Sequence, residues 1–369
     1  MSSRARLLLV ACLLAVSAAI TGFGPPTLVE SDSAVTPVSP GVLRLMHAGR
    51  PPEILAEAAV VLDADTGQVL YEKNAHERRA PASTTKIMTA LVTLENAQLT
   101  DVVRAGNDVQ VEPSIIGLEP GDQLTVEQLL YGLLLPSGND AAIALADHVG
   151  GSIPQFAAMM NAKVAELGLE DTHFVNPHGL DADGHYSSAY DLALTARAAM
   201  RNPVFERIVR TQEYRIEGPV RWVFKNSNRL LGFYPGADGV KTGYTDNAGR
   251  CLVSSATRDG HRAISVVLDS GDTIGDSADL LTYFFSSFTR STLGAAEVPL
   301  GSYTREGEEI RTVARGEVTA VFPTWQKPYL RWFFSPGDES GSADGSAGSV
   351  TYFLFGKKVA EIPLYEAGS

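Results

Sequence analysis

Pro81-Ala82-Ser83-Thr84-Thr85-Lys86-Ile87-Met88-Thr89-Ala90 sets the chemistry and the architecture expected of this chain. Ser83 and Lys86 lie three positions apart at the start of a helix predicted over 83–97, so their side chains share one face. A serine hydroxyl attacks well only after a base accepts its proton, and a lysine can be that base only when neutral. Apolar residues surround much of the helix, which predicts a buried helix in which a charged Lys86 is costly. The pair indicates a nucleophile with its base; an N-cap serine before a solvated lysine is the alternative.

A second polar triplet, Ser137-Gly138-Asn139, separates helices predicted over 126–135 and 141–148. On a tight turn, a serine can relay a proton and an amide can hold a polar substrate group through two hydrogen bonds. A simple helix-to-helix turn in which both residues cap the second helix is the alternative.

A third triplet, Lys241-Thr242-Gly243, follows Asp238-Gly239-Val240 and precedes Tyr244-Thr245. On an edge strand lining a cleft, Lys241 and Thr242 can hold a carboxylate, and Gly243 lets a substrate backbone come close. A surface turn with a solvated lysine is the alternative.

The three motifs occur together and in the order known for β-lactamases and penicillin-binding proteins. With their flanking residues, the segment 51–293 resembles the serine-type D-alanyl-D-alanine carboxypeptidases, which are low-molecular-mass penicillin-binding proteins. The resemblance implies an α+β (mixed α/β) fold, β-lactamase/transpeptidase-like, with an antiparallel sheet flanked by helices and a helical insert.

The same resemblance implies a reaction and its catalytic residues. Ser83 would form an acyl-enzyme, Lys86 would accept its proton, and Ser137 would relay protons to the leaving D-alanine. The substrate would be the D-Ala-D-Ala end of a peptidoglycan stem peptide, with β-lactam antibiotics as covalent inhibitors. No metal or cofactor is expected.

The resemblance also implies substrate-binding residues. Asn139 would bind the substrate amide, and Lys241 and Thr242 would bind the terminal carboxylate beside Gly243. The oxyanion hole would consist of the backbone N–H groups of Ser83 and Tyr244.

The chain on either side of the motifs predicts the domain layout. Hairpins are expected over 58–71 and 250–268 with helices between them, so the first and last hairpins should pair in one sheet. Further helices are predicted over 155–167, 189–200, 203–209 and 276–288, and short strands over 214–216 and 222–224. Alternating short strands after Gly294 predict a small all-β domain over 298–369, with a surface loop over 335–349.

The N-terminus carries Arg4 and Arg6, then an apolar run over 7–19. This pattern is typical of a secretory signal peptide, predicted over 1–24, and the run is short for a membrane span of about 20 residues. Prolines and small polar residues over 25–50 indicate a flexible linker. We expect an exported protein that acts outside the cytoplasm, with the signal cleaved; membrane association would require an uncleaved N-terminal segment.

Composition excludes several classes of protein. The 369 residues include 43 acidic and 30 basic side chains, a net charge of −13, and no basic run suited to nucleic acid. The two cysteines, Cys12 and Cys251, provide neither a disulfide framework nor a zinc site.

Alternative functions follow from the same residues. A D,D-endopeptidase would use the same chemistry on peptidoglycan crosslinks, and a β-lactamase would need a deacylating glutamate that no Glu-x-x-Leu-Asn pattern supplies here. His173, His178 and His185, with Asp181 and Asp183, lie in a turn-rich segment that we interpret as a loop rather than a metal site. A cell-wall binding protein without activity would not need all three motifs complete.

Overall fold

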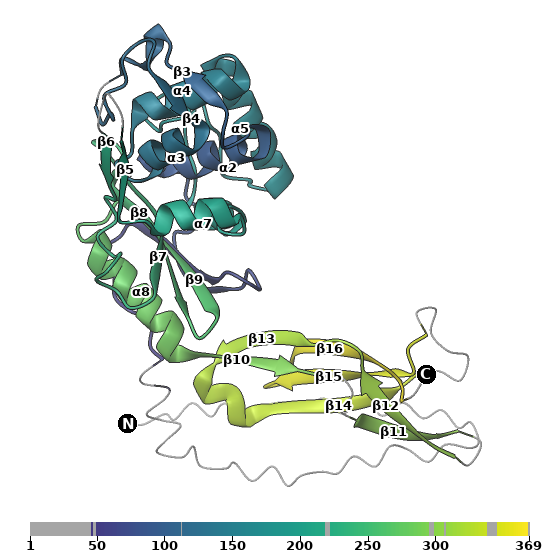
Figure 1. Cartoon of the computed structure of the whole chain (residues 1–369). Coiled ribbons are helices and arrows are strands. Elements are labelled where there is room, and N and C mark those ends of the chain that lie inside the picture. Colours follow the sequence, from purple (N-terminus) through teal and green to yellow (C-terminus); the bar gives the residue numbers. More distant parts are fainter. Residues whose placement is uncertain are drawn as a thin grey trace, which may run out of the picture. The chain divides into compact units, whose positions relative to one another are not determined.

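The computed structural model describes residue 46 and residues 49–111, 113–217, 222–294, 299–305, 308–337 and 345–367 (Figure 1). The predicted signal peptide over 1–24 and most of the predicted linker over 25–50 lie outside these residues. In the described part of the chain, no helix is both long and apolar enough to cross a bilayer.

The centre of the N-terminal part is a five-stranded antiparallel sheet in the order β2-β1-β9-β8-β7. Its first and last hairpins pair, because β1 lies antiparallel to β9 with Val60 opposite Val266, and this confirms the prediction from sequence. β7 forms one edge of the sheet. The strands are β1 Ala58–Asp63, β2 Val69–Lys73, β7 Ala237–Thr245, β8 Gly249–Arg258 and β9 His261–Leu268.

Both faces of this sheet are covered, which explains why β1 is apolar from Ala58 to Leu62. Ala58, Val60 and Leu62 pack into the larger hydrophobic cluster shared with the helices. Ala59 and Val61, which alternate with them, pack on the other face together with Leu280 and Leu281 of α8 (Thr273–Ser287). The sheet therefore forms a buried layer between helices.

The remaining helices lie between the two halves of the sheet in sequence, as predicted. Four of the six begin with a side-chain cap; Thr125 and Gln128, for example, form a complete capping box at the start of α3. The helices are α2 Lys86–Asn96, α3 Val126–Leu134, α4 Asn139–Gly150, α5 Ile153–Leu167, α6 Ala189–Ala199 and α7 Pro203–Arg210.

Helix α2 lies at the centre of the helical layer and contacts α3, α4, α5 and α6. Every residue from Lys86 to Thr93 is buried, as the apolar pattern predicted. The predicted start of this helix is wrong by one turn, because Ala82–Thr85 form the separate 3-10 turn η1 and α2 begins at Lys86. Ala82 has a φ of +48°, which an α-helix cannot contain.

Two short antiparallel pairs lie outside the main sheet. The pair over residues 213–225 was predicted, whereas the pair over 102–125 was missed because each strand has only three residues. The pairs are β3 Val102–Arg104 with β4 Gln123–Thr125, and β5 Glu213–Ile216 with β6 Trp222–Lys225; the 3-10 turn η2 Asn107–Val109 follows β3.

The C-terminal part of the described chain consists of strands and one 3-10 turn, as the predicted all-β character implies. A five-stranded sheet has the order β11-β12-β16-β15-β14, β10 pairs with β13, and a cluster of apolar side chains lies within residues 293–364. The elements are β10 Phe288–Leu293, β11 Pro299–Arg305, β12 Glu308–Ala314, β13 Val318–Pro323, η3 Thr324–Tyr329, β14 Leu330–Pro336, β15 Gly348–Leu354 and β16 Lys357–Glu366. β10 lies inside the segment predicted as 51–293 but pairs with β13, and the domain limits 51–293 and 298–369 stay predictions.

Candidate active site

Ser83 lies on the 3-10 turn η1 directly before the buried helix α2, and Lys86 is the first residue of that helix. The Lys86 Nζ atom lies 2.8 Å from Ser83 Oγ, 2.6 Å from Asn139 Oδ1 and 2.7 Å from the backbone oxygen of His178. Three oxygens therefore fix the position of one amine, and one of them is the predicted nucleophile.

Lys86 is completely buried, which is rare for a lysine. Burial lowers the pKa of its ammonium well below the ordinary value, and the nearby Lys241 lowers it further, while Asp140 opposes the shift. The surroundings thus favour the neutral amine that a general base requires.

The second motif meets the first through Asn139, the first residue of α4. Its side chain accepts from Lys86 and donates through Nδ2 to the backbone oxygen of Pro113 at 2.5 Å. Only 2% of Asn139 is exposed, so contact with a substrate amide would require one of these bonds to be exchanged.

Ser137 has two unusual features. Its φ is +75°, a left-handed conformation that costs a non-glycine residue about 1–3 kcal/mol. Its Oγ atom is buried and has no hydrogen-bond partner among the described residues. A buried hydroxyl normally finds a partner, so this one is available to a substrate or a water.

The third motif lies on β7, the edge strand of the main sheet. Lys241 is only 1% exposed, and burial lowers the pKa of its ammonium to about 7. Its Nζ donates to the Thr242 backbone oxygen at 3.0 Å, and the Thr242 hydroxyl lies 2.6 Å from Ser227 Oγ.

Gly243 brings this strand against the nucleophile turn. A Cβ atom at this position would lie 3.1 Å from the Ser83 nitrogen and 3.2 Å from the Pro81 oxygen, both tight contacts. The absence of a side chain thus lets the backbone around Tyr244 pass beside the Ser83 N–H. The Tyr244 ring itself is 62% exposed, and its hydroxyl donates to Asp246 at 2.8 Å. The structure therefore brings all three sequence motifs together.

A loop over residues 172–186 forms part of this site and was not assigned to it from sequence. Its His178 carbonyl contacts Lys86, and its Gly179, at a φ of +88°, lies directly against η1. A Cβ on Gly179 would be only 1.9 Å from the Ala82 oxygen. The turn residues of Asn176-Pro177-His178-Gly179 predicted a loop, but nothing local indicates what the loop touches.

The histidines of this loop are structural in the described part of the chain. His185 Nδ1 accepts from the Val175 N–H at 3.1 Å, so Nε2 carries the hydrogen and donates to Thr85 Oγ1 at 2.9 Å. Burial, first among the causes, lowers the pKa of His185 to about 4 and that of His178 to about 3, so both rings are neutral at pH 7. Among the described residues, no group of three or more His, Cys, Asp or Glu side chains is placed to hold a metal ion.

The side chain of Asp140, directly after the second motif, binds the backbone of residues 116–118. Asp140, 1% exposed, accepts from the backbone N–H groups of Ile116, Gly117 and Leu118 at 2.9–3.0 Å. Ser114 Oγ donates to the Ser137 oxygen at 3.0 Å. These bonds tie the segment before α3 to the turn that carries Ser137.

Comparison with solved structures defines the class of protein. Penicillin binding protein 5 from Haemophilus influenzae superposes with a TM-score of 0.73 at 29% identity, covering 86% of this chain and 98% of that one. The fold is thus that of the penicillin-binding proteins, as the motif order implied.

The family follows from sequence comparison. The profile for D-alanyl-D-alanine carboxypeptidase matches residues 46–272, and the chain belongs to this family. DacF from Bacillus subtilis is 45% identical over 220 residues, which are 58% of this chain and only 57% of that relative. DacD from Escherichia coli is 34% identical over 339 residues, 85% of this chain and 87% of that protein. The chain thus spans less than two thirds of its Bacillus relative, and the resemblance to the family is confirmed.

Proposed function

We propose that this protein is a serine D-Ala-D-Ala carboxypeptidase that removes the C-terminal D-alanine from peptidoglycan stem peptides. One observation carries the proposal: the arrangement of three oxygens around Lys86 Nζ. Two of them, on Asn139 and His178, are carbonyl oxygens that can only accept. A neutral amine gives them its two hydrogens, and its lone pair then faces the Ser83 hydroxyl.

Acylation follows from this geometry. Ser83 Oγ attacks the carbonyl carbon of the penultimate residue while its proton moves to Lys86 Nζ. The backbone N–H groups of Ser83 and Tyr244 stabilise the negative oxygen of the tetrahedral intermediate. When the C–N bond breaks, D-alanine leaves with a proton relayed from Lys86 through Ser137, whose hydroxyl lacks a protein partner among the described residues.

Deacylation uses the same groups in reverse. Water attacks the ester carbon and gives its proton to Ser137, which passes its own proton to Lys86. Lys86 then returns a proton to Ser83 Oγ as the ester bond breaks. The stem peptide is thereby shortened by one residue, and the free enzyme is restored.

Substrate recognition depends on the third motif. A protonated Lys241 and the Thr242 hydroxyl bind the terminal carboxylate, which restores charge balance to a buried ammonium. A β-lactam carries a comparable carboxylate beside its reactive carbonyl, so we expect it to acylate Ser83 covalently. Because the substrate lies in the cell wall, we propose that the protein acts outside the cytoplasm after export through its N-terminal signal.

The test is the intact mass of the protein after incubation with benzylpenicillin. We expect one penicilloyl adduct on the parent chain, none on Ser83→Ala, and one on the control Ser302→Ala, which changes an exposed serine of β11. An adduct that persists in Ser83→Ala would overturn the mechanism. Release of D-alanine is then compared between a pentapeptide and a crosslinked dimer, and equal turnover of the dimer would identify an endopeptidase instead.

A further inference from the structure

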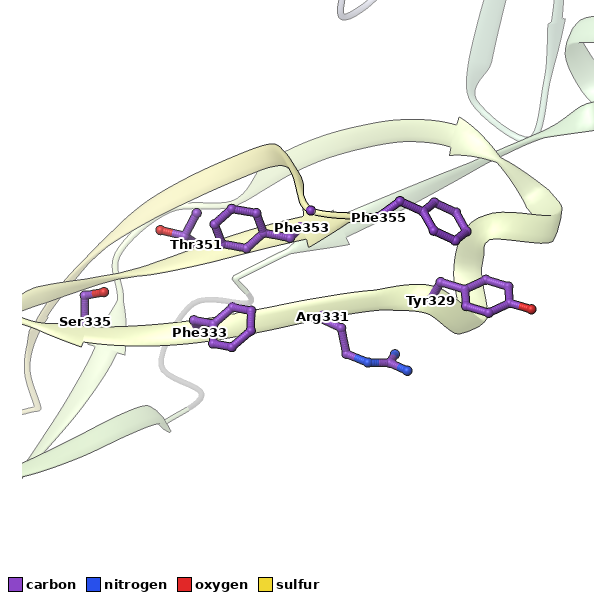
Figure 2. A pocket seen from close by; sticks show the side chains of 8 residues that line it. Tyr329, Arg331, Phe333, Ser335, Thr351, Phe353 and Phe355 are labelled. Carbon is purple, nitrogen blue, oxygen red and sulfur yellow. The ribbon is translucent and has the colours of Figure 1, made fainter. Parts of the chain in front are cut away.

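A groove lies on the C-terminal sheet, outside the site described above. It has a volume of about 620 Å³, within the range of roughly 300–1,000 Å³ typical of ligand sites. Figure 2 shows its side chains following β14 and β15. Its lining residues are Tyr329, Arg331, Phe333, Ser335, Thr351, Phe353, Phe355 and Gly356.

The groove occupies the face of β14 and β15 that points away from the hydrophobic core. Leu330 and Phe334 pack on the core side with Val350 and Leu354. Residues between them, such as Phe333 and Thr351, which lie opposite each other across the two strands, point to the groove. These side chains are therefore not needed to fill the core of the sheet.

Aromatic rings form the two apolar parts of the groove. Phe333 and Phe353 meet edge to face at 5.6 Å, and Phe355 lies 5.1 Å from the Tyr329 ring. Phe333 is 60% exposed and Phe355 is 62% exposed, so most of each ring faces open space. Exposed rings gathered in one concave surface indicate a binding site.

Phe355 has a left-handed backbone conformation, which is uncommon for a bulky residue. Its φ is +50°, at a turn where glycine or asparagine would be unstrained. A bulky ring in this region is uncommon, and such strain typically occurs where a side chain has a function.

Polar groups alternate with the rings. Ser335 and Thr351 lie together at one end, and neither hydroxyl has a partner among the described residues (Figure 2). Arg331 uses only Nη1 to hold two backbone oxygens, those of Pro328 and Leu330 at 3.0 Å. Its Nε and Nη2 hydrogens have no acceptor in the described structure. The groove thus offers flat apolar faces, two hydroxyls and a guanidinium.

We propose that this groove binds the glycan strands of the cell wall, chains of β-1,4-linked N-acetylhexosamines. A pyranose ring has an apolar C–H face, which stacks on an aromatic ring, and a polar edge of hydroxyl and acetamido groups. Phe333 and Phe355 stack the sugar rings, Arg331 donates to acetamido oxygens, and Ser335 and Thr351 bind hydroxyls. This proposal rests on the proposed function, since stem peptides are carried on such strands and binding them raises the local substrate concentration.

The shape and charge of the groove favour a glycan over a lipid surface. A membrane-binding patch presents its rings on a protruding surface, beside clusters of several Lys and Arg residues. Here the rings line a concavity, and Arg331 is the single cation among the described lining residues.

The experiment measures binding of the full chain, with Ser83 already acylated by benzylpenicillin so that the catalytic site is blocked. The probes are cell-wall glycan strands freed of stem peptides and vesicles of phosphatidylglycerol and phosphatidylethanolamine. Phe333→Ala, Phe355→Ala and Arg331→Gln are compared with the control Trp332→Ala, which removes a 54% exposed ring from the opposite face of the same strand. Acylation and thermal unfolding verify that each variant is folded.

We expect the parent and Trp332→Ala to bind the glycan alike, and each groove variant to bind it about tenfold more weakly. Absence of glycan binding by the parent, or equal loss in Trp332→Ala, would overturn the proposal. Binding to vesicles alone, lost in the groove variants, would also overturn it and identify a membrane-binding surface. Carboxypeptidase activity of the unblocked parent on a soluble pentapeptide, measured separately, shows whether a negative result concerns the groove or the proposed function.

Discussion

The candidate active site and the aromatic groove differ most in how far their functional side chains are exposed to solvent. In the catalytic site Lys86 and Lys241 are 0% and 1% exposed, and the surrounding polar atoms hydrogen-bond mainly to one another. In the groove the rings of Phe333 and Phe355 are 60% and 62% exposed, and they contact chiefly other rings. Burial lowers the pKa values of the two lysines in the active site, whereas exposure leaves the rings of the groove accessible to a polymer.

This difference predicts how each region responds to change. A buried amine with three oxygen partners depends on backbone atoms from distant segments, so small displacements should cost activity. The two exposed rings of the groove, Phe333 and Phe355, contribute little to the core beneath it, so they can change without damage to the fold.

The largest effect is expected for Lys86→Met, which removes the base and leaves the oxygens of Asn139 and His178 without their donor. A general base accelerates a reaction by about 10²–10⁴-fold, so the acylation rate with benzylpenicillin should fall by about 10³-fold. Stopped reactions analysed by intact mass give this rate. Lys163→Met, a substitution on α5 outside the site, is the control; a Lys86→Met rate within tenfold of the parent would contradict the assigned role.

Sequence alone is enough to propose much of this site. Ser83, Lys86 and Lys241 can be proposed as site residues because their side-chain chemistry lies in short motifs whose order is recognisable, and the structure brings these motifs together. The pairing of the first and last hairpins followed from their position at the two ends of a segment with helices between them, and the structure confirms it.

Sequence does not predict the parts of the site that are formed by backbone atoms. The hydrogen bond from Lys86 goes to the backbone carbonyl of His178, which any residue would provide. Glycine is required at position 179 by its contact with Ala82, which lies almost a hundred positions away in the sequence. The groove was missed for a similar reason. Alternation along β14 separates Phe333 from Phe334, but it does not tell which face meets the core.

Gly179→Ala should have the second largest effect. The new methyl group would lie 1.9 Å from the Ala82 oxygen, so η1 and the loop must separate. A displacement of this order at the nucleophile lowers the acylation rate by about 10²-fold.

Gly184→Ala is the matched control for that change. Gly184 has a similar φ of +79° in the same loop, but the nearest atom to its added Cβ is 3.9 Å away. Both variants therefore carry the same backbone strain, and only Gly179→Ala carries the clash. Equal acylation rates in the two variants would show that the contact with η1 is unimportant.

The pH dependence of the reaction should report both lysines. In the proposed mechanism Lys86 acts only when it is deprotonated, so kcat/KM should rise as the pH passes its lowered pKa. Lys241 is proposed to bind the carboxylate only when it is protonated, and its pKa is lowered to about 7, so kcat/KM should fall at higher pH. The result is a bell-shaped profile for the free enzyme. Lys241→Arg should remove the alkaline limb because a guanidinium stays charged, and an unchanged limb would assign it to another group.

The smallest effect is expected for Phe355→Asn, which changes a groove ring without touching the core. Asparagine tolerates the φ of +50° at this turn, which relieves strain of about 1–2 kcal/mol. The loss of ring contacts with Tyr329 and Trp325 costs about 0.5–1.5 kcal/mol in the other direction. The two nearly cancel, so the free energy of unfolding should change by less than about 1 kcal/mol, measured by thermal and urea unfolding. Phe353→Asn is the contrasting variant, because Phe353 is half-buried within strand β15, where asparagine is disfavoured. If Phe355→Asn destabilised the protein as much as Phe353→Asn, the exposed Phe355 ring would contribute as much to stability as a half-buried one. The contrast between a rigid active site and replaceable exposed rings would then fail.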